Sequence, residues 1–201
     1  MKIALHVEGE TERHLPEFFK RWLDPKLVQP IGIHPIVFEG VQDYLRHACG
    51  RARRDLESGA LIGGVGLIDL YGSGLTYPDG TIEQKYRAAK HDLERRVAHP
   101  RFRQHFAVHE TEAWLFSDTA IFPDAIASEL PKTANPETIN FQNPPSKRLK
   151  DLYFRKLSKK YKKPVEGSSM FRKLDPEKAY ARCPFLQVLL DDLLELAHPG
   201  A

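Results

Sequence analysis

Acidic residues gather at three points of this sequence, and each point follows a short apolar segment. The acids are Glu8, Glu10 and Glu12, then Asp69, and then Glu110 and Glu112. Carboxylates that lie close together repel each other and raise each other's pKa, and a divalent cation removes that repulsion. Oxygen ligands without cysteine and with little histidine suit Mg²⁺ or Mn²⁺. If the fold brings the three points together, the acids predict a site for one of these metals.

Each acid also has a simpler explanation when it is taken alone. An acid near the start of a helix usually caps the helix or interacts with its dipole, and Asp69 could cap the loop that follows it. Glu10 is expected to point to solvent or to cap a helix start. Glu12 lies four residues after Glu8, so both side chains can face the same point. Capping explains one acid more easily than it explains acids that converge from three strand ends, and we favour a metal site for the set.

The segments that precede the acids have the patterns of strands and helices in alternation. The strand patterns lie at Lys2–Val7, Ile31–Phe38, Leu61–Leu70 and Phe102–His109, and the helical patterns at Thr11–Trp22, Val41–Ser58 and Thr81–Ala98. This alternation predicts an α/β fold with a mostly parallel sheet flanked by helices. Pro35 favours an edge position for the second strand. Ligands bind at the carboxyl edge of such a sheet, where the three groups of acids would meet.

The pattern changes after Asp118, where prolines divide the chain into short helical segments. The stretch Leu186–Leu196 is typical of a terminal helix. We predict an α/β core over residues 1–118 and a helical, basic C-terminal extension over residues 119–201 that packs on the core. The glycine-rich loop Gly72–Gly80 lacks the Lys-Ser/Thr ending of a phosphate-binding P-loop, so we interpret it as a mobile loop near the site.

The composition limits the class of protein. The chain has 201 residues, 41% of them hydrophobic, which is enough for one domain with a buried core. No apolar segment approaches the roughly 20 residues of a membrane helix, and the N-terminus lacks the pattern of a signal peptide. These features predict a cytoplasmic protein without membrane contact. Cys49 and Cys183 lie far apart without a CxxC partner, which argues against a zinc site or a disulfide framework.

The segment Lys147–Lys173 is strongly basic and contains several aromatic residues. Basic residues interleaved with aromatic ones suit a phosphate backbone with bases to stack on. A solvated helix with its own apolar stripe explains the segment equally well. The net charge of +3 is a weak argument for a polyanionic partner. The candidates for contact with DNA or RNA are Lys147, Arg148, Lys150, Tyr161, Lys162 and Lys163.

Several motifs, in this order along the chain, carry a family resemblance. They are VEGETE (7–12), IDLYG (68–72), HETEAWLFSD (109–118), PSKRL (145–149) and CPF (183–185). VEGETE resembles the first motif of Toprim domains, in particular that of nucleases of the overcoming-lysogenization-defect family. Together the motifs resemble the DUF4276 family, and HETEAWLFSD is the most specific of them. The resemblance implies a Toprim-like fold, Mg²⁺-dependent chemistry on phosphodiesters, and work beside an ABC-type or related ATPase in bacterial defence against phage.

The chain departs from the Toprim pattern after its central strand. Toprim proteins usually carry Asp-x-Asp there, whereas this chain has Asp69-Leu70-Tyr71. Glu110 or Glu112 could replace the missing ligand, because residues two apart on an extended strand share a face. Tyr71 would orient a ligand or pack. It is not expected to be a topoisomerase nucleophile, because the large DNA-gate domains are absent at this length.

The resemblance implies metal-assisted hydrolysis of phosphodiester bonds, in which two ions about 4 Å apart activate water and stabilise the leaving oxygen. The expected metal ligands are Glu8, Glu12, Asp69, Glu110 and Glu112. Among them, Glu8, Asp69 and Glu110 are predicted to be catalytic. A cation must also balance the charge on the pentavalent phosphate, and Lys147 is our candidate, with Arg148 or Lys150 as alternatives.

Two other functions fit the same residues. The chain could be a Toprim-like adaptor or regulatory subunit of an ATPase complex with weak catalysis, which the missing second aspartate favours slightly. It could also transfer phosphoryl groups on nucleotides or small phosphoesters, which the basic, aromatic segment disfavours. His109 beside the acids is more simply a structural histidine than a proton relay. A homo-oligomer is compatible with either function.

Overall fold

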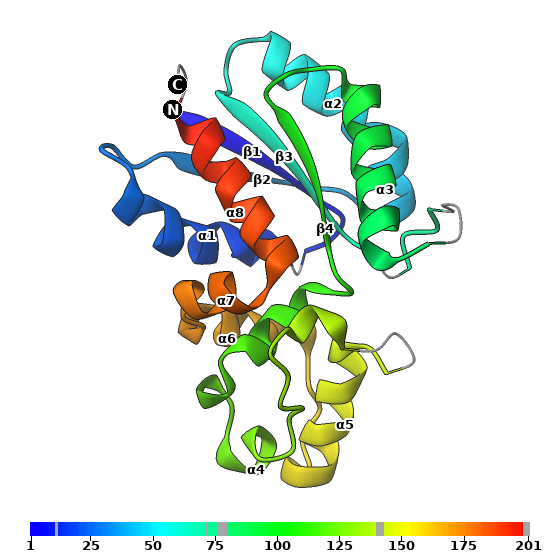
Figure 1. The fold of residues 1–201 in the computed structure, drawn as a ribbon, viewed down its shortest axis with the longest axis vertical. Coiled ribbons are helices and arrows are strands. Elements are labelled where there is room, and N and C mark those ends of the chain that lie inside the picture. Colours follow the sequence, from blue (N-terminus) through cyan, green and yellow to red (C-terminus); the bar gives the residue numbers. More distant parts are fainter. Residues whose placement is uncertain (11, 71, 76–79, 140–142, 199–201) are drawn as a thin grey trace.

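A four-stranded, fully parallel sheet forms the centre of the protein, in the order β2-β1-β3-β4 (Figure 1). The computed structural model describes residues 1–10, 12–70, 72–75, 80–139 and 143–198. The strands are β1 (Lys2–Val7), β2 (Gly32–Val37), β3 (Gly63–Asp69) and β4 (Phe102–Ala107). The edge position predicted for the strand with Pro35 is confirmed, since β2 pairs with β1 alone.

Helices cover both faces of the sheet. On one face lie α2 (Val41–Glu57) and α3 (Ile82–Val97), and on the other lie α1 (Leu15–Leu23) and α8 (Pro184–Ala197) (Figure 1). All seven residues of β3 are buried, because both faces of this central strand are covered. The nearly continuous apolar run in the sequence is therefore explained by its place in the sheet.

Two main apolar clusters hold the layers together. The first joins the α1 and α8 face of the sheet, and Phe19, Val65 and Leu189 belong to it. The second lies under α2 and α3 and includes Tyr44 and Phe106. The first cluster extends into the helices beyond the sheet, through Trp114 and Leu152. Because one apolar core spans the α/β part and these helices, the C-terminal third packs on the sheet and its neighbours.

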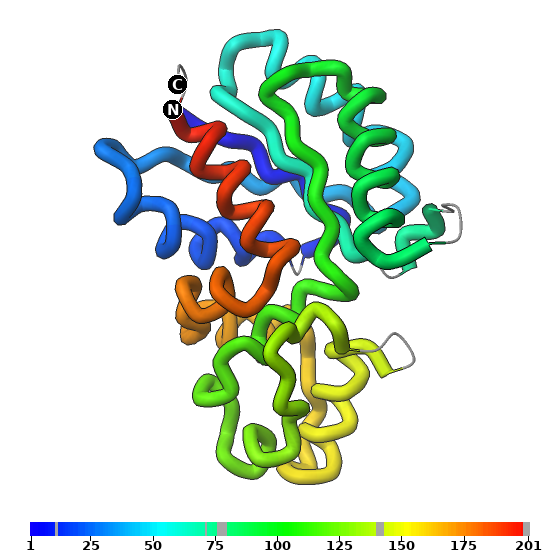
Figure 2. The backbone as a smooth tube through the Cα atoms, viewed as in Figure 1, coloured from blue at the N-terminus to red at the C-terminus, as the bar shows by residue number. Residues whose placement is uncertain are grey.

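The remaining helices lie beyond the carboxyl ends of the strands, where β4 leads into them (Figures 1 and 2). The α-helices are α4 (Asp124–Ala127), α5 (Pro145–Leu157), α6 (Ser168–Lys173) and α7 (Pro176–Arg182). Short 3₁₀ segments occur at Glu12–His14, Asp24–Lys26, Thr111–Ser117, Thr119–Ile121 and Pro136–Thr138, and a π-helical turn at Lys163–Gly167. The functional side chains described below are shared between the strand ends and this outer group of helices.

The predicted fold class is confirmed, with element bounds that differ from the sequence pattern by a few residues: β1 matches its prediction, several elements are shorter, and α8 is longer than the predicted Leu186–Leu196. The helix expected to begin at residue 11 begins with the 3₁₀ turn Glu12–His14, and the segment expected to continue into a helix after β4 is the 3₁₀ segment Thr111–Ser117. The boundary near residue 118 stays a prediction. Within the described ranges, no helix has both the length and the apolar character needed to cross a membrane.

Candidate active site

The side chain of Lys163 lies among three carboxylates at the carboxyl edge of the sheet. Its Nζ atom is 3.1 Å from Oε2 of Glu112, 3.5 Å from Oδ2 of Asp69 and 3.6 Å from Oε1 of Glu12. Asp69 ends β3, Glu12 follows β1 and Glu112 follows β4. The structure therefore brings together acids that follow three different strands, as the sequence predicted for a parallel sheet.

The VEGETE motif places two glutamates at this edge and turns a third one away. Glu8 comes directly after β1, and Glu12 begins the 3₁₀ turn that leads into α1. Gly9 permits this arrangement, because a Cβ atom there would lie only 3.2 Å from Oε2 of Glu12. Glu10 is exposed and pairs with Arg13 at 3.0 Å, so the prediction that it points to solvent is confirmed.

The backbone after β4 holds the central aspartate in place. The backbone N–H of Thr111 donates a hydrogen bond to Oδ1 of Asp69 over 3.2 Å. The Thr111 hydroxyl donates to Oε2 of Glu112 over 3.4 Å. All three side chains are buried. This polar bridge links the ends of β3 and β4 and orients the carboxylate of Asp69 toward Lys163.

Glu110 reaches the start of α5 instead of Lys163. The backbone N–H of Ser146 donates to Oε2 of Glu110 over 2.8 Å, and the Ser146 hydroxyl donates to Oε1 over 3.0 Å. A helix N-terminus carries free N–H groups and the positive end of the helix dipole, so it stabilises a carboxylate. Glu110 thereby fastens the PSKRL motif to the edge of the sheet.

Burial and mutual repulsion raise the pKa of the clustered acids. Burial, with repulsion from Glu12, raises the pKa of Glu8 to about 7, although the Asp69 backbone and Lys163 oppose the rise. Burial is also the main cause of the raised pKa of Asp69, Glu12 and Glu112. For these three acids the ammonium group of Lys163 lowers the pKa against that trend. The site holds more negative charge than it can neutralise easily, which is the condition that a bound cation relieves.

Lys163 supplies the positive charge that faces these acids. Burial lowers its pKa, but attraction to Asp69, Glu112 and Glu12 outweighs burial, and the pKa of Lys163 is raised overall. Its side chain is 24% exposed, so it remains reachable from solvent. Because its pKa is raised, Lys163 stays charged at physiological pH. It also begins the π-helical turn Lys163–Gly167, a type of turn that is rare and often found at functional sites.

A shallow hollow of about 280 Å³ opens onto the cluster. Glu8, Glu12 and Lys163 line it, together with the backbone of Gly9, Gly40 and Gly72 among other residues. The glycines leave the hollow free of bulky side chains. Of the clustered acids, Glu8 and Glu12 therefore line this opening together with Lys163.

The donors at this edge suit a hard divalent cation in their chemistry. They are all carboxylate oxygens, and Oε1 of Glu112 is buried without a hydrogen-bond partner in the described part of the chain. However, no three His, Cys, Asp or Glu side chains of the described residues are already arranged to hold a metal ion. Instead, the carboxylates are drawn around the ammonium group of Lys163. A metal would bind by taking over contacts that Lys163 now makes.

The other predicted contact residues are spread over the outer helices. Lys147 and Lys150 on α5 are exposed, Arg148 is half-buried, and Lys162 is exposed. Tyr161 is only 4% exposed, and its ring packs against Tyr153 with 5.3 Å between the ring centroids. A contact between Tyr161 and a nucleic acid stays a prediction that this burial does not favour. The contacts of the exposed lysines also stay predictions.

Two further positions complete the comparison with the sequence. His109 is buried, and burial lowers its pKa to about 4, so the imidazole is neutral near pH 7. Tyr71 and the residues 76–79 of the glycine-rich loop lie outside the described residues. The sequence did not indicate that Ser146 and Thr111 would bind acids, or that Lys163 rather than its neighbours would enter the cluster. No local signal separates these residues from other serines, threonines and lysines.

The chain belongs to the family described as a domain of unknown function (DUF4276), whose model matches residues 7–194. Among curated proteins, none matches the sequence. The structure is similar to the C-terminal region of the Burkholderia pseudomallei OLD protein, with a TM-score of 0.52 and 17% sequence identity over 98% of each chain. At this level of identity the similarity establishes the fold, and the expected Toprim-like α/β architecture is confirmed.

Proposed function

We propose that this protein is a metal-dependent nuclease that hydrolyses phosphodiester bonds of DNA or RNA. The observation that carries the proposal is the convergence of Glu12, Asp69 and Glu112 on one point at the carboxyl edge of the sheet. Nothing in the packing of a small α/β protein requires buried carboxylates there, because burying unneutralised charge destabilises the fold. The similarity of the fold to a region of an OLD protein supports the same conclusion.

The residues proposed to hold Mg²⁺ or Mn²⁺ are Glu8, Glu12, Asp69, Glu110 and Glu112. Such an ion, when bound, lowers the pKa of a coordinated water and neutralises charge on the phosphate. Asp69 is oriented for this role by the N–H of Thr111. Both carboxylate oxygens of Glu110 accept hydrogen bonds from Ser146, so Glu110 would have to share them with a metal ion. Glu8, whose pKa is about 7, must lose its proton before it can be a ligand.

Lys163 is proposed to assist the same reaction by carrying a fixed positive charge at the site. We expected this role of Lys147, which is exposed near the start of α5. Lys163 is better placed, because its Nζ atom already lies beside the acids and lines the open hollow. If a metal ion were held by these carboxylates, the ammonium group of Lys163 would be available to the phosphate oxygens. A cation in this position stabilises the negative charge that develops during phosphoryl transfer.

A second candidate function rests on the same lysine. Lys163 pairs with three carboxylates without any metal and offsets part of their charge, and the chain lacks the second aspartate of Asp-x-Asp. A protein that had lost catalysis could keep its fold through this internal ion pair and serve as an adaptor. In this case the site would bind neither Mg²⁺ nor Mn²⁺ in the millimolar range.

Metal binding and cleavage together separate the two functions. Purified protein is mixed with labelled duplex DNA, single-stranded DNA or structured RNA in Mg²⁺, Mn²⁺ or EDTA, and its melting temperature is measured in the same buffers. Glu8→Gln removes a proposed ligand, and Glu10→Gln is the matched control, because Glu10 belongs to the same motif but is exposed and paired with Arg13.

The nuclease proposal expects metal-dependent cleavage and a metal-induced rise in melting temperature, both lost in Glu8→Gln and retained in Glu10→Gln. Absence of cleavage and of any metal-induced rise would favour the adaptor. A rise without cleavage would indicate a competent site that waits for a partner.

The partner proposed for that case is an ABC-type or related ATPase, and the proposed setting is defence against phage. This part of the proposal rests on the family resemblance of motifs such as HETEAWLFSD. Co-purification of the protein with a candidate ABC-type ATPase, followed by the cleavage assay with ATP, tests the pairing. Equal cleavage with and without the ATPase would argue against it.

A further inference from the structure

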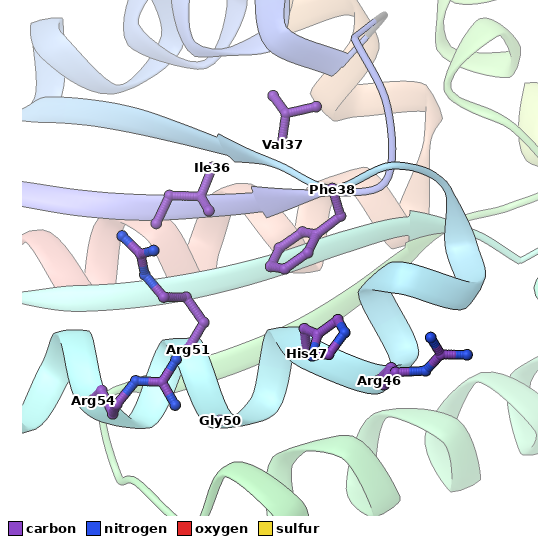
Figure 3. Close-up of a pocket in the computed structure, with 8 residues that line it drawn as sticks. All are labelled: Ile36, Val37, Phe38, Arg46, His47, Gly50, Arg51 and Arg54. Carbon is purple, nitrogen blue, oxygen red and sulfur yellow. The ribbon is translucent and has the colours of Figure 1, made fainter.

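We infer that a groove between β2 and α2 binds the phosphate backbone of the nucleic acid and leads it to the acidic site. The inference rests on the proposed nuclease function and adds the surface that holds the substrate. The groove has a volume of about 410 Å³. Ile36 and Phe38 form its wall on the side of β2, and Arg46, Arg51 and Arg54 form its wall on the side of α2 (Figure 3).

The arginines stand on one side of α2 because of their spacing. Residues 46, 50 and 54 are four apart, so they form one row along a helix, and residues 47 and 51 form the adjacent row. Figure 3 shows the Arg51 side chain reaching from α2 toward Ile36. The distance from residue 46 to residue 54 along the helix axis is about 12 Å, at about 1.5 Å per residue. One strand of a duplex places about three to four phosphates in that length.

Two of these arginines are available for an anion. Arg51 binds Asp55 at 2.7 Å, and His47 lies 3.6 Å from Asp43. In contrast, no carboxylate of the described residues lies within ion-pair distance of Arg46 or Arg54, and both side chains are exposed. Guanidinium groups match phosphate oxygens in geometry and bind them with paired hydrogen bonds.

Gly50 lies between these arginines in the interior of α2 and lacks a packing reason. Glycine in a helix interior costs about 1 kcal/mol relative to alanine. A Cβ atom at position 50 would meet only the end of Arg54, at an ordinary contact distance of 3.5 Å. Packing against neighbouring atoms therefore does not explain why α2 has glycine instead of alanine at this position. A bare backbone at this point allows a phosphate or sugar to approach the helix closely.

Shared lining residues connect the groove to the acidic site in two steps. A second hollow of about 590 Å³ shares Val37 and Phe38 with the groove, and it shares Glu8, Gly9 and Gly40 with the hollow that contains Lys163. The middle hollow also contains Glu39 and the ion pair of Glu10 with Arg13. The carboxylate of Glu39 opposes a phosphate there, so we assign phosphate binding to the α2 end and metal-assisted contact to the Glu8 end.

The experiment removes charge from the groove and, as a control, from the neighbouring helix. Arg46→Ala/Arg54→Ala is compared with Arg87→Ala/Arg95→Ala, whose residues are also exposed and also eight apart, but on α3. Binding of labelled single-stranded and duplex DNA and RNA is measured by fluorescence anisotropy in EDTA at several salt concentrations. The metal-induced rise in melting temperature is measured on each variant without nucleic acid.

We expect the α2 variant to lose at least tenfold in affinity and to show a weaker salt dependence, because each lost phosphate contact reduces the slope of log K against log salt by about one. Its metal response should equal that of the wild type. The α3 control should change affinity less than threefold. Equal losses in both variants, or no loss in the α2 variant, would overturn the inference and leave the nuclease proposal standing. Absence of any metal response in the wild type would instead count against the nuclease proposal, while the binding data would still test the groove.

Discussion

The Nζ atom of Lys163 lies 3.1 Å from Oε2 of Glu112, so a lysine of the C-terminal part completes an acidic cluster built by the strand ends. The contact joins the π-helical turn after α5 to the 3₁₀ segment after β4. An ion pair at this depth costs desolvation of both partners, and breaking it leaves charges that nothing balances. The behaviour of the site should therefore depend more on Lys163 than on any exposed lysine.

Replacing Lys163 should destabilise the metal-free protein and strengthen its response to metal. Lys163→Met keeps the length of the side chain but leaves Glu12, Asp69 and Glu112 without their counter-charge. We expect a loss of about 3 kcal/mol, or about 10 °C in melting temperature. Millimolar Mn²⁺ should restore much of this loss, because the cation replaces the ammonium group. Lys162→Met, which changes an exposed neighbour, is the control. A variant as stable as the wild type in EDTA would show that the ion pairs are weak.

Metal binding should weaken as the pH falls through about 7. Burial and Glu12 raise the pKa of Glu8 to about 7, so a proton competes with the metal for this carboxylate below that pH. The metal-induced rise in melting temperature should be larger at pH 8 than at pH 6. A rise that is independent of pH over this range would exclude Glu8 as a ligand.

The same pKa predicts how Glu8 affects the stability of the metal-free protein. The raised pKa means that the folded state binds the Glu8 proton more tightly than the unfolded chain does. Above pH 7 the carboxyl is ionised in both states, and burying its charge then destabilises the folded state most. Glu8→Gln should therefore melt higher than the wild type at pH 8 in EDTA, and the difference should shrink toward pH 5. Parallel melting curves of both proteins from pH 5 to pH 8 test the sign. A difference that grows toward low pH would contradict it.

Removing the Ser146 hydroxyl should loosen Glu110 without unfolding the protein. Ser146→Ala deletes the 3.0 Å hydrogen bond to Oε1 of Glu110 but leaves the backbone hydrogen bond to Oε2. A hydrogen bond to a charged group contributes about 1.5 kcal/mol or more, which corresponds to about 3–6 °C in melting temperature. Ser169→Ala on the exposed side of α6 should change neither stability nor metal response. Identical melting of the two variants would mean that Glu110 is held by α5 backbone alone.

Glu137 should matter for stability but not for the site. Its buried carboxylate accepts hydrogen bonds from Trp114 Nε1 and from the backbone N–H groups of Phe185 and Leu186 at the start of α8. Glu137→Ala leaves these donors buried without partners, and we expect a loss of about 3 kcal/mol. Tryptophan fluorescence should report the change around Trp114. The metal-induced rise in melting temperature should persist, and its disappearance would show that this carboxylate is coupled to the acidic cluster.

The sheet could be predicted from the sequence because each strand carries its own signal. The run before Asp69 is apolar throughout because both faces of β3 are covered, and Pro35 marks the edge because its ring nitrogen cannot donate to a neighbouring strand. Since parallel strands end at one edge, the meeting of Glu8, Asp69 and Glu112 followed from the order of the elements alone.

The contacts across the chain could not be predicted in this way. Lys163 follows another lysine in the sequence, and only the packing of α5 and the π-helical turn decides which ammonium group turns inward. The sequence also did not indicate that the ring of Tyr161, a predicted contact of nucleic acid, would be buried beside Tyr153. The arginines of α2 belong to an ordinary charged helix in the sequence, and only the structure shows that they face the edge strand across a groove.

The position of Lys163 also has a consequence for biosynthesis. Ribosomes make the chain from its N-terminus, so all the acids up to Glu112 are synthesised before the lysine that balances them. Until Lys163 has emerged, the nascent sheet edge can lose its excess charge only by taking up protons or by borrowing a cation from the cell. A segment made after all four strands thus decides when the strand ends can close, and a polypeptide stopped before Lys163 would keep mutually repelling carboxylates at this edge.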